Sequence, residues 1–338
     1  MGYHQKPQYL SKTLEQDLLL PRVLFLRSPS VPSFFFSKSH LQAHFHLVDP
    51  LDSPEPTHSF LSRHAASVLA LLCVASTRVS SETLSLLPSL KLVVASSAGL
   101  DHIDLGECRR RGITVTSAGQ VFTEDVADFA VGLLIDVLRR VSASDGCVRA
   151  RLWAEKRPFP LGVKLGGNRV GIVGLGRIGS EVAKRLIDFG CSIAYCSRKE
   201  KPSVPYPYYS TVSELATNSD VLILCCSLTK ETHHIINKGV MEALGKEGVI
   251  INIGRGALID EKELVKFLEQ GQIRGAGLDV YENEPHVSQE LFAMENVVLA
   301  PHAAVYTLES FAALQELVVG NLKAFFSNKP LLTPAQLE

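Results

Sequence analysis

The chain has 338 residues, in which 34 Lys and Arg nearly balance 35 Asp and Glu, so charge gives no reason to expect nucleic acid or an anionic membrane as a partner. A hydrophobic fraction of 46% and a charged fraction of 20% are typical of a folded globular protein and exclude a disordered chain. Since a single core seldom grows beyond about 250 residues, the length predicts two domains.

The start of the chain and its cysteines bear on the compartment. Residues 1–20 mix basic and acidic side chains and lack the apolar core of a secretory signal, so we expect a loose N-terminal extension. The uncharged stretch 65–77 is too short to cross about 30 Å of hydrocarbon. Seven scattered cysteines without a CxxC pair favour buried free thiols over disulfides or a metal site. These features predict a cytoplasmic protein with no membrane partner.

The first third of the chain predicts a parallel sheet followed by a long helix. Apolar runs alternate with polar segments, and no glycine fingerprint follows the first run, so we do not expect a nucleotide in this domain. Apolar residues at helical spacing predict long helices at 124–140 and 307–326. The expected strands are 23–26, 44–48, 68–73, 92–95 and 114–116.

A second run of alternating strand and helix signals predicts a doubly wound parallel sheet. Asp260 is a good N-cap for a helix at 261–270 and Gly271 a good stop, while 201–209 reads as an irregular loop. We therefore predict a discontinuous first domain at 21–120 and 305–335, and a second domain at 121–304. The expected strands are 170–173, 193–196, 221–226, 249–253, 276–280 and 297–300.

A glycine motif lies between the first strand and the first helix of the second domain. It reads Gly174-Leu175-Gly176-Arg177-Ile178-Gly179. Such glycines let the chain turn tightly and let bare backbone approach a pyrophosphate at the helix N-terminus. Surface turns also use glycine, but a clear strand before the motif and a clear helix after it favour dinucleotide binding.

The residues about twenty positions beyond the glycines bear on the choice of cofactor. NAD enzymes usually place an acidic residue there, on the ribose 2′-hydroxyl. This chain instead has Ser197-Arg198-Lys199, whose charges suit a 2′-phosphate. The alternative is a basic surface turn. We predict NADPH as the cofactor, with NADH as a weaker substitute.

Three later strand ends carry side chains suited to hydride chemistry. Arg255 lies between Gly254 and Gly256, and its planar fork suits a carboxylate. Glu284 and His302 follow the next two strands. Taken singly, these could be a solvated arginine, a solvated acidic loop and a structural histidine. Because carboxyl ends of parallel strands meet at one edge, we expect them to converge on one crevice, as reduction of a keto acid requires.

Several motifs together resemble the D-isomer-specific 2-hydroxyacid dehydrogenases, and more closely their plant glyoxylate, hydroxypyruvate and hydroxyphenylpyruvate reductase branch. The resemblance covers residue 21 to the end, and segments 99–105 and 325–334 favour the plant branch. The family motifs are Gly174–Gly179, Asn252–Gly256, Gly277-Leu278-Asp279, Glu284-Pro285 and Pro301-His302.

The resemblance implies a catalytic trio and its roles. Arg255 would bind the substrate carboxylate, His302 would protonate the keto oxygen, and Glu284 would hydrogen-bond His302. It also implies a homodimer built on the 124–140 helix and the segment after it, where Trp153 lies. Further expected contacts are Ser97, Ala98 and Gly99 with substrate, and Ser227, Ile253 and Asp279 with cofactor, besides the glycine motif and 197–199.

The implied fold is a Rossmann NAD(P)-binding domain plus a flavodoxin-like substrate domain, with a cleft between them and no metal. The implied activity is NADPH-dependent reduction of small 2-keto acids, such as glyoxylate, hydroxypyruvate and 4-hydroxyphenylpyruvate, to D-2-hydroxy acids. Ser227 replaces a frequent proline, and 303–306 departs from the commonest form, which leaves substrate preference open. The alternative is a nucleotide-gated, corepressor-like binding protein on the same fold.

Overall fold

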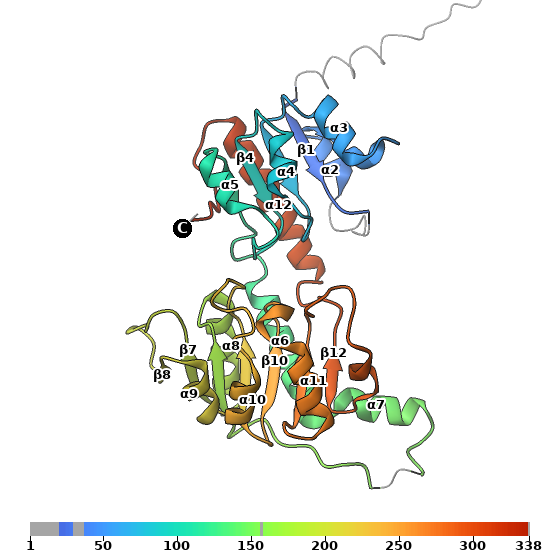
Figure 1. Cartoon of the computed structure of the whole chain (residues 1–338), viewed down its shortest axis with the longest axis vertical. Coiled ribbons are helices and arrows are strands. Elements are labelled where there is room, and N and C mark those ends of the chain that lie inside the picture. The colour runs from blue at the N-terminus through green and yellow to red at the C-terminus, as the bar shows by residue number, and fades with distance from the viewer. Residues whose placement is uncertain (1–19, 30–36, 156–157, 337–338) are drawn as a thin grey trace, which may run out of the picture. The chain divides into compact units, whose positions relative to one another are not determined.

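The computed structural model describes residues 20–29, 37–155 and 158–336, and the predicted extension 1–20 lies almost wholly outside them. The chain divides into two compact units (Figure 1). Unit 1 comprises Met1–Phe122 and Thr307–Glu338, and unit 2 comprises Thr123–Tyr306. Among the described residues, no helix combines the length and the apolar character needed to cross a bilayer.

Unit 1 is built on a five-stranded parallel sheet of order β2-β1-β3-β4-β5. All four residues of β3 and of β4 are buried, because helices cover both faces of such a sheet. This is the flavodoxin-like strand order. The strands are β1 Arg22–Leu26, β2 His46–Val48, β3 Ala70–Cys73, β4 Leu92–Ala95 and β5 Thr114–Thr116, and the α-helices are α2 Lys38–Gln42, α3 Thr57–His64, α4 Ser81–Ser85, α5 Leu105–Arg110 and α12 Leu308–Phe326, with a 3₁₀ turn η2 at Pro50–Asp52.

The end of the chain returns to unit 1 through α12. Figure 1 shows this helix, drawn in red, beside the strands of unit 1. Thr307 caps it by accepting from Ser310 N at 3.0 Å. The fully buried Asn321 accepts from Leu332 N at 2.9 Å and donates to Thr333 Oγ1 at 3.1 Å. These bonds fasten the C-terminal tail to the same unit as the first five strands.

Unit 2 is built on a seven-stranded parallel sheet of order β12-β11-β10-β9-β6-β7-β8. If the strands are numbered from β6 onward within the unit, the order is 7-6-5-4-1-2-3. This is the dinucleotide-binding order 3-2-1-4-5-6 with one more strand at an edge. The strands are β6 Arg169–Val173, β7 Ser192–Cys196, β8 Tyr208–Tyr209, β9 Val221–Leu224, β10 Val249–Asn252, β11 Gly275–Leu278 and β12 Val297–Leu299. The helices are α6 Thr123–Arg139, α7 Val141–Arg149, α8 Arg177–Asp188, α9 Val212–Thr217, α10 Lys238–Leu244 and α11 Glu261–Glu269, with 3₁₀ turns η3 Gly256–Leu258 and η4 Gln289–Ala293.

Helix α6 packs on this sheet because β11 leaves room for it. A Cβ added to Gly277 would lie 3.2 Å from Leu133 Cβ and 3.4 Å from Val137 Cγ2. A larger side chain would push the helix away, so the bare backbone of β11 allows a close approach. The helix contributes eight buried residues to the core: Val126, Ala127, Ala130, Val131, Leu133, Leu134, Val137 and Leu138.

The predicted class of two doubly wound parallel-sheet domains is confirmed, while the cleft between them stays a prediction. The long helix predicted at about 124–140 is α6, and the bounds agree within one residue. It ends at Arg139 because Arg140 adopts φ 56°, and α7 follows, where Ser142 N donates to Asp136 Oδ1 at 2.8 Å. One local prediction was wrong. Within the expected loop 201–209, Tyr208 and Tyr209 pair with β7 as an edge strand.

All seven cysteines are free, as the sequence predicts. Five are buried, and Cys225 and Cys226 are half-buried where β9 ends. Burial raises the pKa of the Cys108 thiol and that of Cys226 to about 11, so these thiols stay protonated near neutral pH.

Candidate active site

The glycine motif forms a tight turn from β6 into α8. Gly174 has φ 96°, and a Cβ there would lie 2.6 Å from the backbone nitrogen of Cys226. Gly179 is buried, and a Cβ on it would overlap the carbonyl oxygen of Gly174. Glycine is therefore required at the first position by conformation and at the third by packing between helix and strand.

The second glycine of the motif faces open space. No heavy atom lies within 4 Å of a Cβ built on Gly176. Gly176 is the N-cap of α8, and no side chain caps this helix start. A twelve-residue helix that begins with uncapped N–H groups and an open backbone is an anion-binding geometry. These features fit the pyrophosphate of a dinucleotide.

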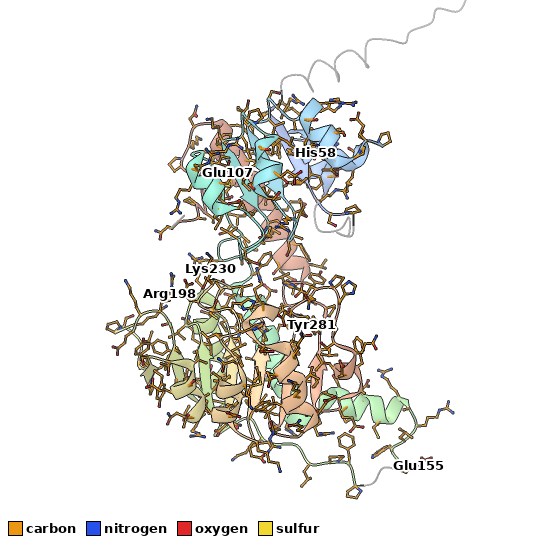
Figure 2. The ribbon with its side chains drawn as sticks, viewed as in Figure 1. His58, Glu107, Glu155, Arg198, Lys230 and Tyr281 are labelled. Atoms are coloured by element: carbon orange, nitrogen blue, oxygen red, sulfur yellow. The ribbon has the colours of Figure 1, made fainter. Side chains whose placement is uncertain are left out.

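The basic segment after β7 lies beside the glycine turn. Ser197 Oγ donates to Lys199 O at 2.8 Å, which shapes the turn that carries Arg198. Lys201 Nζ donates to the carbonyl oxygen of Leu175, inside the glycine motif. Figure 2 shows Arg198, Lys230 and Tyr281, which follow β7, β9 and β11, at the end of unit 2 where these strands terminate. Positive charge is therefore placed next to the anion-binding helix start.

Two further predicted cofactor residues follow the neighbouring strands. Ser227 is exposed, and its carbonyl oxygen accepts from Thr232 Oγ1 at 2.8 Å. Ile253 is 8% exposed and directly follows β10. Ser227 follows β9, which neighbours β6, and Ile253 follows β10, the next strand along the sheet. Both therefore lie beyond the carboxyl ends of strands, where open α/β sheets place their ligands.

The loop that presents Arg255 is held by a buried asparagine. Asn252, 1% exposed, donates through Nδ2 to Arg255 O at 2.8 Å and accepts from Gly254 N at 3.1 Å. A Cβ at Gly256 would overlap the backbone of Tyr281, so this glycine lets the loops after β10 and β11 touch. The guanidinium donates to Gly254 O at 2.8 Å. The backbone around Arg255 is thus held by Asn252 and by the contact at Gly256, in addition to this bond from its own side chain.

Glu284 and His302 are directly paired. His302 Nδ1 lies 2.8 Å from Glu284 Oε2, and about a third of each side chain is exposed. Tyr281 N donates to the other carboxylate oxygen of Glu284 at 3.1 Å. With Nδ1 engaged by the carboxylate, the Nε2 atom of His302 is left to exchange a proton with a ligand.

The electrostatics of this pair include Arg255. Burial acts to raise the pKa of the Glu284 carboxyl, but the hydrogen bond and charge of His302, the N–H of Tyr281 and the charge of Arg255 outweigh it, so this pKa is lowered. A carboxylate at Glu284 is therefore the stable form near neutral pH. The structure brings the three predicted catalytic side chains into one charged group on unit 2.

Asp279 anchors the segment that carries His302. It is 1% exposed, and its two carboxylate oxygens accept from Ala303 N at 2.7 Å and from Ala304 N at 3.0 Å. His302 N donates to Asp279 O at 2.8 Å, which completes a three-bond clamp. Burial raises the pKa of Asp279 against these hydrogen bonds. The clamp holds His302 at φ 54°, and the predicted contact of Asp279 with the nicotinamide stays a prediction.

The predicted substrate loop lies in unit 1, after β4. Ser96 is buried and accepts from Ala75 N at 2.8 Å, and Ser97 Oγ donates to Gly99 O at 2.8 Å. Ala98 at the tip is exposed. Within the described part of the chain, no acceptor is found for the backbone N–H groups of Ala98 and Gly99. Two adjacent N–H groups on an ordered loop can bind a carboxylate.

Sequence reasoning missed three residues that shape the site. Asn252 belongs to the motif Asn252–Gly256, and a buried amide at a strand end also signals hydrogen bonds that build the following loop. Tyr281 donates to Ala300 O at 2.9 Å and so links the ends of β11 and β12, which no local pattern predicts. Lys201 follows the basic pair 198–199 after one acidic residue, Glu200, and this nearby positive charge is a signal that the sequence offers.

Comparisons with known proteins agree with this geometry. Residues 131–304 match the family described as D-isomer specific 2-hydroxyacid dehydrogenase, NAD binding domain. A glyoxylate/hydroxypyruvate reductase of Arabidopsis thaliana is 56% identical over 319 residues, covering 94% of this chain and 98% of the relative. A hydroxyphenylpyruvate reductase of Plectranthus scutellarioides is 50% identical over 275 residues, covering 81% and 88%.

Among solved structures, an NADPH-dependent glyoxylate/hydroxypyruvate reductase of Sinorhizobium meliloti in complex with NADP and malonate aligns with a TM-score of 0.86. It is 36% identical, and the alignment covers 94% of this chain and 97% of that one. A glyoxylate reductase of Paecilomyes thermophila aligns with a TM-score of 0.83 at 32% identity, covering 94% and 98%.

Proposed function

The chain belongs to the D-isomer specific 2-hydroxyacid dehydrogenase family, and on that premise we propose that it reduces small 2-keto acids to D-2-hydroxy acids with NADPH. The observation that carries the proposal is the 2.8 Å pairing of His302 with Glu284, beside Arg255. A proton donor with an orienting carboxylate and a carboxylate-binding cation are the groups that this reduction requires.

In the proposed reaction each side chain has one task. Arg255 binds the carboxylate of the keto acid through its planar fork and polarises the keto oxygen. His302 donates the proton on Nε2 to that oxygen as the keto group is reduced to an alcohol. Glu284 accepts from Nδ1, which orients the ring so that Nε2 faces the ligand. The bound cofactor supplies the hydride that adds to the keto carbon.

The chain's own residues fit NADPH. The uncapped start of α8 and the open backbone at Gly176 suit the pyrophosphate. Arg198, Lys199 and Ser197, after β7, suit the 2′-phosphate that distinguishes NADPH from NADH. The family is an NAD(P)-binding one, and the phosphate preference rests on these basic residues.

The substrates we propose are glyoxylate, hydroxypyruvate and 4-hydroxyphenylpyruvate. In unit 1, Ser97, Ala98 and Gly99 are the proposed substrate-binding loop, because the backbone N–H groups of Ala98 and Gly99 can bind a carboxylate. All three acids share the 2-keto carboxylate that these groups recognise, and they differ only in the substituent. The names of the plant relatives support this set.

The test is a matrix of kcat/KM values for the three keto acids with NADPH and with NADH. We expect turnover of at least one acid, with NADPH preferred, and the D enantiomer as product. Protein that binds NADPH yet oxidises none of it with any of these acids would contradict the proposal. That result would favour a nucleotide-gated binding protein on the same fold.

Replacing Arg198 with Ala should weaken NADPH binding by about 10–100-fold and change NADH binding little, because one charge-assisted bond to the 2′-phosphate contributes about 1.5–3 kcal/mol. Fluorescence titration with both cofactors measures the two dissociation constants. Arg274→Ala, which removes a paired surface arginine of the same unit, is the control and should leave both unchanged. Equal losses for the two cofactors would rule out the phosphate assignment.

We further propose a homodimer and a reducing compartment such as the cytoplasm. Val141 and Val148 on α7 and Trp153 just after it are 50%, 55% and 55% exposed, which makes this segment of unit 2 an apolar surface suited to a second copy. Light scattering of the purified protein gives its mass in solution, and a monomer at micromolar concentration would contradict the dimer. Seven free cysteines support the reducing compartment.

A further inference from the structure

A group of side chains of the types that ligate metals lies in unit 2, and it includes none of the three predicted catalytic residues. His233, His234 and Glu282 each offer one donor atom, and these three atoms lie within 4.8 Å of one another. His234 Nε2 is 2.9 Å from Glu282 Oε1. The imidazole rings of His233 and His234 stand 4.0 Å apart between centroids, tilted by 30°. In the described part of the chain this is the one such group of three.

The backbone on both sides of the group is held in place. His233 N donates to Thr229 O at 3.0 Å, and His234 N donates to Ala257 O at 2.8 Å. On the other segment, Glu282 N donates to Glu261 Oε2 at 3.0 Å, and Glu261 is 8% exposed. The ligand atoms therefore sit on two ordered segments, one after β9 and one after β11, so little ordering remains to be done on binding.

We propose that His233, His234 and Glu282 bind a divalent transition-metal ion of the Zn²⁺ type. Two imidazole nitrogens and one carboxylate oxygen are donors that Zn²⁺ prefers, at about 2.0–2.2 Å. In a tetrahedral site such bonds place donor atoms about 3.4 Å apart. His234 Nε2 and Glu282 Oε1 are 2.9 Å apart and no two of the three donor atoms are more than 4.8 Å apart, so the spacing is close to what such a site needs. Water completes the coordination, because His233 is exposed.

The simpler interpretation is a hydrogen bond between His234 and Glu282 with no metal. His233 distinguishes the metal site from this simple hydrogen bond, because it takes no part in the bond but supplies the third donor atom of the metal site. The inference does not depend on the proposed reductase activity, because Arg255, Glu284 and His302 are not ligands. A bound ion would link the segment after β9 to the loop that carries Glu284.

The experiment titrates tag-free, chelator-treated full chain with Zn²⁺ by calorimetry, and with Co²⁺ while recording its visible d–d absorption. We expect one strong site per chain. Loss of an outer-shell partner typically weakens metal binding about 10–100-fold, so His233→Gln and Glu282→Gln, which remove ligands, should each weaken it at least about 100-fold. His286→Gln removes an exposed histidine four residues after Glu282 and is the matched control.

Circular dichroism checks that the variants fold. If Glu282→Gln does not fold, His233→Gln alone is enough to test the proposal. The proposal is upheld if the control binds Zn²⁺ like the unmodified chain while His233→Gln does not. It is overturned if the unmodified chain shows no site, or if His233→Gln binds as tightly as the control. Because the readout is metal binding, a chain without reductase activity could still support it.

Discussion

Replacing His302 with Asn should lower kcat for hydroxypyruvate by about 10²–10⁴-fold while NADPH still binds, because general acid catalysis by a positioned side chain contributes about that much. Asparagine suits the position. His302 has φ 54°, a region in which Asn is among the least strained residues, so the clamp by Asp279 should persist. The amide can still hydrogen-bond to Glu284 but cannot release a proton. The defect should therefore be chemical and not structural.

Steady-state oxidation of NADPH followed by absorbance measures kcat, and fluorescence titration measures cofactor affinity. His286→Asn, the same change at an exposed histidine of unit 2, is the control and should retain full turnover. If His302→Asn turns over like the control, His302 has no part in proton transfer. If NADPH affinity falls with kcat, the side chain helps build the cofactor site instead.

The parts of the fold that were predicted correctly are those specified by local pattern. The run Val170–Val173 reads as a strand because parallel strands are buried on both faces, and β6 is buried over those residues. Asp260 was expected to cap a helix, and its side chain accepts from Glu263 N at 3.2 Å. Each of these features depends on a few consecutive residues, so no knowledge of the tertiary structure is needed.

The features that were missed depend on partners distant in sequence. Arg140 interrupts a helix although arginine is a good helix former, and the carboxylate of Asp136 then bonds to the start of α7. Strand β8 has only two residues, too few to show a period-two pattern.

In the candidate site too, some features follow from local sequence and others depend on partners distant in sequence. Its residue types follow from the motifs, and the carboxyl ends of parallel strands explain why they converge. Which atoms meet could not be foreseen. Asp279 accepts hydrogen bonds from residues 24 and 25 positions later, and Asn252 determines how Arg255 is presented. Contacts of this kind depend on the register of β10, β11 and β12, which the alternation of apolar residues does not specify.

Replacing Arg255 with Gln should lower kcat/KM for glyoxylate by about 10²–10⁴-fold. Two charge-assisted hydrogen bonds to the carboxylate contribute about 1.5–3 kcal/mol each, and both are lost. The loop itself should survive the loss of the guanidinium bond to Gly254 O, because the two hydrogen bonds of the Asn252 side chain to this backbone remain. NADPH affinity should change little, so the loss should appear in kcat/KM for glyoxylate and not in the dissociation constant of NADPH.

Arg255→Lys tests whether shape matters beyond charge. Lysine keeps the positive charge near Glu284 but cannot form two parallel bonds, so its kcat/KM should lie between those of the unmodified chain and Arg255→Gln. Arg274→Gln, which removes an arginine paired with Glu247 just before β11, should behave like the unmodified chain. A solvated arginine at 255 would instead make all three variants alike. The graded order separates a carboxylate-binding fork from a loop residue whose charge only happens to lie near the histidine.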